Sequence, residues 1–375
     1  METSRRTLLA GLGGLALTGL GGDGGVAASQ PAGPAYLSAG RAQDSTYYLA
    51  MLSTSADSIS RFVLPARGHG VAVSLDKKTA VMFARRPGTF ASVLDTRHAR
   101  HTITIDAPKG RHFYGHGAFS VDGRLLYATE NDFDGERGVI GVYDAHDGYA
   151  RIGEMPSYGI GPHDMLLDTT GDILVVANGG IATHPDAPRV KLNLDTMRPS
   201  LAFIQRRNGA LLAEQRLPPD LHHLSIRHLA RGANGQVAMG LQSQSTPDTT
   251  HPLVGVSAGP LSHIRLLDMP HDALNRMRGY CGSVAFDSSE TVLAATSPRG
   301  GLAVFWNVVS GNYLGQVSLA DCCGVAPMIE RGAFVLTSGT GAVAKVETGT
   351  NGVSHQEMQA PSAGTHWDNH LSAVL

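Results

Sequence analysis

The fold of this chain is decided by HGAFSVDGRLLYATENDFDGERGVIGVYDAHDGYARIGEM, the stretch from His116 to Met155. It contains four short runs of aliphatic, β-branched and aromatic residues, namely His116–Val121, Leu125–Glu130, Gly138–Asp144 and Ala150–Met155. The Asp-Gly pairs at 122–123 and 147–148 interrupt it. Apolar runs of this length, cut by Asp and Gly, predict four β-strands joined by tight turns.

The same pattern recurs along the chain, and each recurrence begins with a His or a Cys. The seven openings read HGVAVSLD, HGAFSVDG, HDMLLDTTG, HLARGANG, CGSVAFDS, CGVAPM and HLSAVL, and they begin at His69, His116, His163, His228, Cys281, Cys323 and His370. The first two intervals and the last are each 47 residues. A recurrence with this period indicates a repeat architecture. Four strands per repeat predict an all-β fold, a seven-bladed β-propeller.

The two ends of the chain complement each other in this scheme. The last repeat holds only its first strand, His370–Leu375, and three further strands are predicted at Ala35–Ala39, Thr46–Ser53 and Ser58–Leu64. Strands from both termini then share one blade, which removes the open sheet edge of a linear array. We therefore expect residues 29–375 to form a single propeller domain. Two segments depart from the repeat: an insertion at Gly179–Arg198 and a short helix predicted within Pro270–Arg278.

The N-terminus is typical of an export signal. Arg5 and Arg6 precede a moderately apolar run to Leu20, and small residues follow at Val26–Ala28. This pattern predicts a Tat signal over residues 1–28 and a periplasmic mature protein. No other apolar run is long enough to span a bilayer, so no membrane span is expected in the mature chain.

Composition and cysteine spacing argue against some partners and cofactors. The net charge is −2 with no basic stripe, which argues against nucleic acid as a partner. The chain lacks a C-x-x-C-H motif and therefore a covalent c-type haem. Its three cysteines, Cys281, Cys322 and Cys323, leave at least one thiol outside any disulfide.

The repeated His and Cys residues are the main candidates for chemistry. Because the first strand of each blade lines the channel of a propeller, these residues should ring one mouth of that channel. Imidazole and thiolate are ligands for copper, zinc and iron, so we expect a transition-metal site, with iron or copper as the cofactor. The candidate metal ligands are His69, His116, His163, His228 and His370, and the first four are the preferred set. Cys281 and Cys323 are weaker thiol candidates, and Glu130 or Asp132 could add an oxygen ligand.

The ends of the second strands should face the same mouth. The polar residues there form the predicted ligand-binding set: Arg85, Arg86, Glu130, Asn131, Asn178, Gln242 and Arg299. The arginines could hold an anion by forked hydrogen bonds or could be solvated loop charges. A structural role for the ring is the alternative to metal binding, in which His and Cys fill a tapering channel and hydrogen-bond to the backbone.

Further evidence comes from the segments Phe113–Tyr149, Gly159–Leu167, Val176–Pro185, Lys191–Leu201, Leu224–Ala230 and Thr296–Gly301. These segments resemble a bacterial exported family known as domain of unknown function 1513. The resemblance covers nearly the whole mature chain and implies a quinoprotein-dehydrogenase-like or YVTN-like propeller. It also implies an association with imelysin-type, iron-regulated periplasmic proteins as partners. The family has no established activity, so it assigns no catalytic residue.

These observations lead to one expected function and two alternatives. We expect an exported propeller that binds a transition metal, or a metal-bearing partner, at a His-lined mouth in iron or copper handling. The first alternative is a non-catalytic interaction scaffold of an iron-uptake system. The second is an enzyme, either an oxidoreductase or a lactonase-like hydrolase, although the sequence contains no G-x-S-x-G, P-loop or H-E-x-x-H motif.

Overall fold

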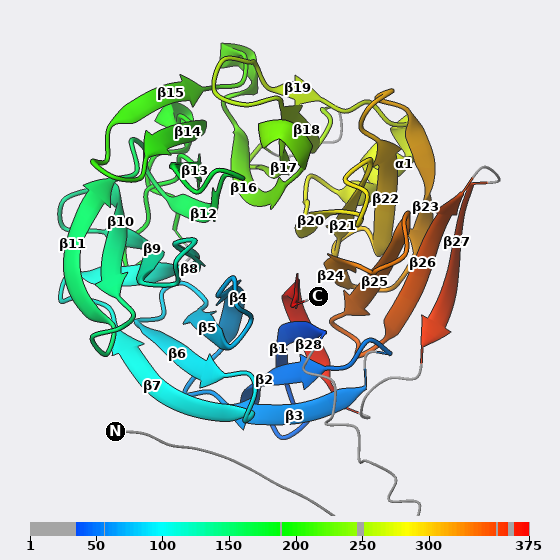
Figure 1. Ribbon diagram of the computed structural model, residues 1–375. Helices are drawn as coiled ribbons and strands as arrows, with labels where there is room; N and C mark the ends of the chain where they lie inside the picture. The colour runs from blue at the N-terminus through cyan, green and yellow to red at the C-terminus, as the bar shows by residue number, and fades with distance from the viewer. Residues whose placement is uncertain are drawn as a thin grey trace, which may run out of the picture. The chain divides into compact units, whose positions relative to one another are not determined.

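The computed structural model describes residues 35–55, 57–187, 190–245, 251–349, 352–358 and 364–374. The predicted Tat signal at 1–28 lies outside these residues. The described residues form seven four-stranded antiparallel sheets arranged in a ring, which confirms the predicted seven-bladed β-propeller (Figure 1). The blades are numbered from the first complete sheet, and in each the first-listed strand lies innermost.

Blades 1 to 4 follow the chain in order from Gly68 to Leu266. Blade 1 contains β4 (Gly68–Val73), β5 (Thr79–Ala84), β6 (Phe90–Asp95) and β7 (Arg100–Asp106). Blade 2 contains β8 (Arg111–Phe119), β9 (Leu125–Asp132), β10 (Arg137–Asp144) and β11 (Ala150–Pro156). Blade 3 contains β12 (Pro162–Leu167), β13 (Ile173–Asn178), β14 (Ser200–Gln205) and β15 (Leu211–Gln215). Blade 4 contains β16 (Leu224–Arg231), β17 (Val237–Ser243), β18 (Val254–Ser257) and β19 (Arg265–Leu266).

Blades 5 and 6 complete the consecutive part of the ring. Blade 5 contains β20 (Ser283–Phe286), β21 (Val292–Ser297), β22 (Leu302–Asn307) and β23 (Tyr313–Ser318). Blade 6 contains β24 (Cys322–Pro327), β25 (Ala333–Ser338), β26 (Val343–Gly349) and β27 (Gly352–Met358). The predicted helix is α1 (His271–Met277). The described residues also contain short 3-10 turns at Leu194–Thr196, Pro219–Leu221 and Ala233–Gly235.

Blade 7 closes the ring with strands from both ends of the chain. Its order is β28 (His366–Ala373), β1 (Tyr36–Arg41), β2 (Tyr47–Leu52) and β3 (Ser58–Val63). Tyr36 pairs with Ala373 and Arg41 with His366. This confirms the predicted closure. The last strand begins four residues before His370, so this histidine lies inside the strand and not at its head as predicted.

The core lies between neighbouring blades. Every residue of β21 and of β25 is buried, because these second strands are covered on both faces. Outer strands such as β7 are mostly exposed, and in β7 only Ile103 and Ile105 are covered. Phe83 of blade 1 packs edge-on against Phe113 of blade 2, with ring centroids 5.6 Å apart. Apolar clusters of this kind fix the angle between blades and thereby the width of the channel.

The innermost strands share an irregularity where the repeated His or Cys occurs. In six blades the pairing of the innermost strand with its neighbour shifts register near the repeated residue. On the innermost strands the shifts lie between Gly68 and Val71, Phe113 and Gly117, Pro162 and Asp164, Ile226 and His228, and Cys322 and Val325. In blade 7 the shift lies between Ser38 and Gly40 of β1, which pair with Leu371 and Trp367 of β28. A bulge of this kind bends the strand and re-aims a side chain. Six blades therefore turn the residues at this level away from the regular alternation of the strand.

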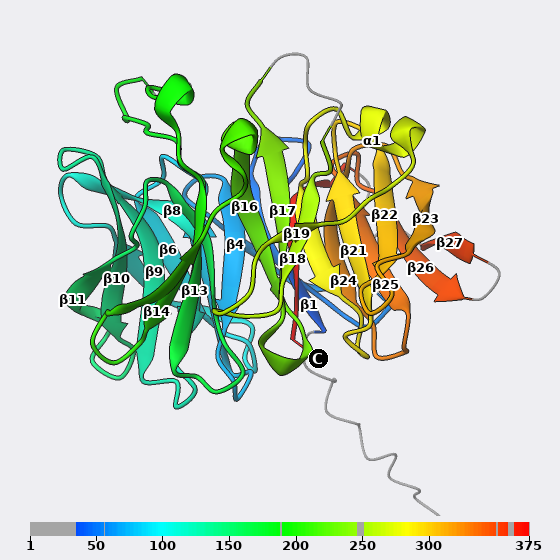
Figure 2. The same cartoon turned by 90° about the horizontal axis from the view of Figure 1, so that it is seen from above.

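The two segments that depart from the repeat lie on the same side of the ring. Figure 2 shows α1 above the strands on one side, with the green insertion that follows β13 on that side as well. Asn193 fixes the insertion, because its Oδ1 accepts from Ala182 N at 2.7 Å and its Nδ2 donates to Gly180 O at 2.9 Å. Within the described part of the chain, no helix is long and apolar enough to cross a membrane.

Candidate functional site

Five histidines from five blades meet at the centre of the ring. They are His370, His69, His116, His163 and His228, from blades 7, 1, 2, 3 and 4. Going round in that order, the centroids of successive imidazoles are 4.5, 4.9, 5.2 and 4.8 Å apart, and His228 returns to His370 at 4.9 Å. The five side chains, called the histidine ring below, therefore form one closed cluster.

The histidine ring closes without blades 5 and 6 because the cysteines there point elsewhere. Cys281 precedes β20 and packs against Gly240 of blade 4, where a Cβ would come within 2.7 Å of its Sγ. Cys323 Sγ lies 3.5 Å from Thr337 O and 3.6 Å from Trp367 O. Burial raises the pKa of Cys281 to about 12 and also raises that of Cys323. The structure therefore separates both thiols from the ring and keeps them in the apolar packing between blades.

Two triads within the ring have the spacing of a metal site. In each, one donor atom per residue lies within 4.8 Å of the other two: His69, His116 and His163 form one triad, and His116, His228 and His370 form the other. A tetrahedral ion with bonds of about 2.1 Å holds its donors about 3.4 Å apart. The rings would thus close in by roughly an ångström around an ion. Because His116 belongs to both triads, it is the central candidate ligand.

Buried carboxylates from neighbouring blades orient two of the imidazoles. Asp368 Oδ1 of blade 7 lies 3.2 Å from His69 Nδ1, and Asp164 Oδ1 of blade 3 lies 3.1 Å from His116 Nδ1. A carboxylate on one nitrogen fixes the tautomer and makes the other nitrogen more basic, as in many metal sites. This arrangement leaves Nε2 of both histidines as the available donor.

Several nitrogens of the histidine ring are buried and make no hydrogen bond to the described residues. Among the described residues, His116 Nε2, His163 Nδ1, His228 Nδ1 and His370 Nε2 are buried without a hydrogen-bond partner. Burial lowers the pKa of His69 to about 4, and it lowers the pKa of His163, His228 and His370 well below the usual value. Neutral imidazole is the form that binds a metal, so these four histidines are suited to bind at neutral pH.

Glycines beside the histidines make this packing possible. A Cβ on Gly115 would lie 2.6 Å from His69 Cδ2, and the residue has φ +106°. A Cβ on Gly70 would lie 2.7 Å from His116 Nδ1. Both glycines stand next to a ring histidine in sequence. Glycine at these two positions is thus a packing requirement between blades 1 and 2.

A basic cavity of about 720 Å³ lies on the α1 side of the ring. Three ring histidines contribute to its lining, which also contains six basic side chains: Arg85, Arg86, Lys191, Arg227, Arg278 and Arg299. None of the described residues that line it is Asp or Glu. Burial, and then the charge of Arg86, lowers the pKa of Arg227 to about 10. The cavity is therefore strongly positive.

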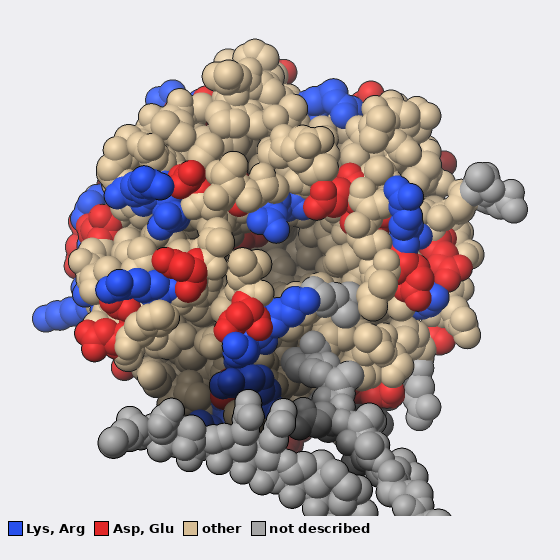
Figure 3. All heavy atoms as spheres, viewed as in Figure 1, with Lys and Arg blue, Asp and Glu red and all other residues tan. Residues whose placement is uncertain are grey.

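A second cavity opens on the other side of the ring. It is lined by His116, His228 and His370 together with the carboxylates of Asp164, Asp287 and Glu290. Figure 3 shows a hollow at the centre of one face, with acidic and basic side chains around it. His228 lines both cavities, so the histidine ring separates two openings of the channel.

Only some residues of the predicted ligand-binding set line the α1-side cavity. Arg85, Arg86, Gln242 and Arg299 line the α1-side cavity as expected. Asn131 and Asn178 do not, since they are buried in hydrogen bonds inside the structure. Asn131 Nδ2 donates to Thr183 O at 3.0 Å and holds the insertion, while Asn178 Nδ2 donates to Ser157 O at 2.8 Å.

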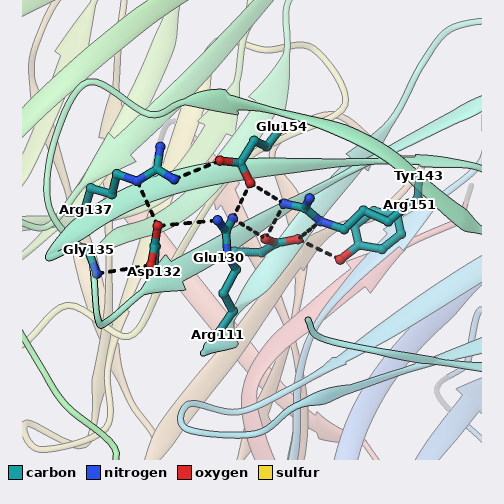
Figure 4. A network of polar contacts seen from close by, with 8 residues as sticks. All are labelled: Arg111, Glu130, Asp132, Gly135, Arg137, Tyr143, Arg151 and Glu154. Carbon is teal, nitrogen blue, oxygen red and sulfur yellow. Dashed lines mark hydrogen bonds and ion pairs between the residues drawn. The ribbon is translucent and has the colours of Figure 1, made fainter. Parts of the chain in front are cut away.

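Glu130 also lies away from the channel, in an ion network on blade 2. Its carboxylate accepts from Arg151 Nη2 at 3.0 Å and from the Tyr143 hydroxyl at 2.6 Å, and it is fully buried (Figure 4). Asp132 pairs with Arg137 at 2.8 Å in the same network. The network links the strands of one blade, so neither acid is available as an oxygen ligand to the ring.

Three important residues were missed from the sequence. Asp164 directly follows one ring histidine, Asp368 precedes another by two residues, and Arg227 directly precedes a third. Acids within two residues of the repeated histidine were the available signal. Which histidine each acid contacts depends on the neighbouring blade and could not be inferred from the repeat.

Residues 62–374 match the family described as "Protein of unknown function (DUF1513)", and the chain belongs to that family. No curated protein matches its sequence. Among solved structures, it is similar to hydrazine synthase of Kuenenia stuttgartiensis, with 12% identity, a TM-score of 0.60, and coverage of 90% of this chain and 99% of that one. It is also similar to a chain of a mitotic checkpoint complex, with 11% identity, a TM-score of 0.55, and coverage of 79% and 80%. At these identities the likeness concerns the fold alone.

Proposed function

We propose that this DUF1513 protein, after export to the periplasm, binds one transition-metal ion, iron or copper, in the histidine ring. The observation that carries the proposal is the set of convergent imidazoles with buried, unpartnered nitrogens. Buried polar atoms normally find a partner. Four such atoms in one cluster are explained if the partner is an ion.

The carboxylates behind two of the ring histidines support the same function. Asp164 and Asp368 each hold a ring histidine through Nδ1, as carboxylates do behind metal-bound histidines. The negative charge of Asp164 would also offset part of the charge of an ion held by neutral ligands, whereas the charge of Asp368 is shared with Arg67 and Arg85. Imidazole suits both iron and copper, and the intrinsic affinity order favours Cu²⁺ over Fe²⁺.

The test is metal binding by the full chain after chelator treatment. Cu²⁺ and, under anaerobic conditions, Fe²⁺ are titrated against a competing chelator, and the bound metal is counted by elemental analysis. We expect one ion per chain and an affinity at least a hundredfold lower in His116→Asn, since both triads lose a member. His101→Asn, on the exposed face of β7, is the matched control. If neither metal binds, or if His116→Asn binds as the wild type does, the proposal is overturned.

A scaffold role is favoured by one further observation. Val190 and Leu192 on the insertion are 52% and 56% exposed, and Lys191 between them lines the α1-side cavity. Two apolar side chains on a loop that overhangs a cavity suit a protein contact. A Val190→Ser/Leu192→Ser variant should fold normally and lose co-purification of a periplasmic partner, such as an imelysin-type protein. Retained co-purification would remove this alternative.

A further inference from the structure

We infer that the α1-side cavity is a binding site for a small oxyanion that carries two or more negative charges, of the polycarboxylate or phosphate class. The inference concerns the space above the histidine ring and does not depend on a metal in the ring. It starts from the charge of the cavity wall.

The basic side chains at this cavity are short of counter-charges. Arg85 Nη1 lies 3.5 Å from Asp368 Oδ1, but that carboxylate is already shared with Arg67 and His69. For Arg86, Lys191, Arg227, Arg278 and Arg299, no carboxylate partner is present among the described residues. Like charges gathered in a hollow repel one another and attract a counter-ion of matching valence.

The contacts that these side chains do make hold them at the cavity without neutralising them. The guanidinium of Arg299 stacks over the Tyr280 ring at 4.5 Å, and Arg278 Nη1 donates to Arg299 O at 3.5 Å. The Nε of Arg227 is buried without a partner. A buried guanidinium nitrogen with no acceptor lacks the bond that an oxyanion would supply.

The chemistry of the wall selects oxyanions over other anions. Five of the six basic residues are arginines, whose planar forks bind carboxylate or phosphate through paired hydrogen bonds. Neutral donors complete the wall, with Gln242 and Asn369 near the ring and Asn275 on α1. The volume of about 720 Å³ lies within the range of small-ligand sites and suits a ligand of metabolite size.

The test uses citrate and inorganic phosphate as probes and glycerol as a neutral control. Binding to the chelator-treated full chain is measured by calorimetry at low and raised ionic strength. We expect at least one anion to bind, glycerol to show no binding, and added salt to weaken the affinity. Preference for citrate would assign the polycarboxylate class, and preference for phosphate would assign the phosphate class.

Variants locate the binding. Arg86→Gln/Arg227→Gln should weaken binding at least tenfold, and Lys191→Gln, an exposed change on the insertion that leaves the core untouched, should weaken it severalfold. Arg100→Gln on β7 is the control. Circular dichroism verifies the fold of each variant. No binding of either anion, or binding unchanged in the cavity variants, overturns the inference.

The metal proposal can fail separately. His116→Asn should bind the anion as the wild type does, because His116 does not line this cavity. Anion binding that appears only after metal is added would mean that the anion is a ligand of the metal, and the independent site would be rejected.

Discussion

Asp164 of blade 3 holds His116 of blade 2 through a contact of 3.1 Å between Oδ1 and Nδ1. Its other oxygen accepts a hydrogen bond from Leu229 N of blade 4 at 2.9 Å. One carboxylate therefore ties three blades together at the level of the histidine ring. Asp368 acts similarly from blade 7, where it contacts His69 and Arg67 of the segment that begins blade 1.

Asp164→Asn should lower metal affinity about tenfold to a hundredfold, which is the usual effect of losing a carboxylate behind a metal-bound histidine. An amide still fills the space but lacks the negative charge that holds the Nδ1 side of His116. Chelator competition measures the change. Asp172→Asn, in an exposed turn of blade 3, is the control and should bind as the wild type does. Equal affinity in the two variants would contradict the role of Asp164.

Gly115→Ala should displace the His69 imidazole, since the added Cβ would lie 2.6 Å from Cδ2. The positive φ of 106° adds backbone strain of about 1–3 kcal/mol. We expect a lower melting temperature and weaker metal binding. Gly123→Ala is the matched control, because it also has positive φ but no atom within 4 Å of the added Cβ. A loss of metal affinity as large in the control would show that strain alone is responsible.

The stability of the metal-free protein should fall as the pH drops from about 6.5 to about 4. His112 is buried, and its burial lowers its pKa to about 4. In this window the unfolded chain gains a proton at this residue and the folded chain does not, so protonation favours unfolding. A shift of this size corresponds to about 3 kcal/mol.

His112→Gln isolates this contribution in urea titrations at several pH values. The variant should show a shallower dependence on pH than the wild type between pH 6.5 and 4. The imidazole accepts from Asn131 Nδ2 at 3.0 Å through Nε2 and donates to Phe113 O at 2.9 Å through Nδ1. Protonation would turn the acceptor into a donor facing another donor. Parallel pH profiles would contradict this explanation.

Glu130→Gln should destabilise blade 2 by about 3–5 kcal/mol, the usual cost of removing one partner from a buried ion network. Arg111 and Arg151 would remain part-buried beside a neutral amide. Glu347→Gln, which breaks the pair between the exposed Glu347 and the half-buried Lys345, should cost less than about 1 kcal/mol. Urea unfolding compares the two. Unchanged metal stoichiometry in Glu130→Gln would agree with its position outside the channel.

Cys281→Ala should leave metal stoichiometry and affinity unchanged, because the thiol packs between blades 4 and 5. The loss of a buried sulfur should cost roughly 1–2 kcal/mol of stability. Elemental analysis and thermal denaturation measure the two effects. A variant that loses its metal would instead place Cys281 among the ligands.

The sequence by itself determined the fold and the level of the candidate site. Asp-Gly turns between short apolar runs specify strands, the 47-residue spacing specifies equal blades, and the shared final blade follows from the complementary ends. These are local or periodic properties. The repeat also placed every histidine of the ring at one level, because equal blades put equal positions at equal heights.

Tertiary structure alone decided which of these residues meet. All seven repeat positions look equivalent in sequence, yet the ladder shifts beside His116 turn that side chain into the channel, whereas Cys281 precedes its strand and packs between blades. Tertiary structure likewise decides the roles of Glu130 and Arg227. Glu130 lies in an ion network within blade 2, and Arg227 lines the α1-side cavity. Contacts between blades involve residues far apart in the chain, and no periodicity in the sequence specifies them.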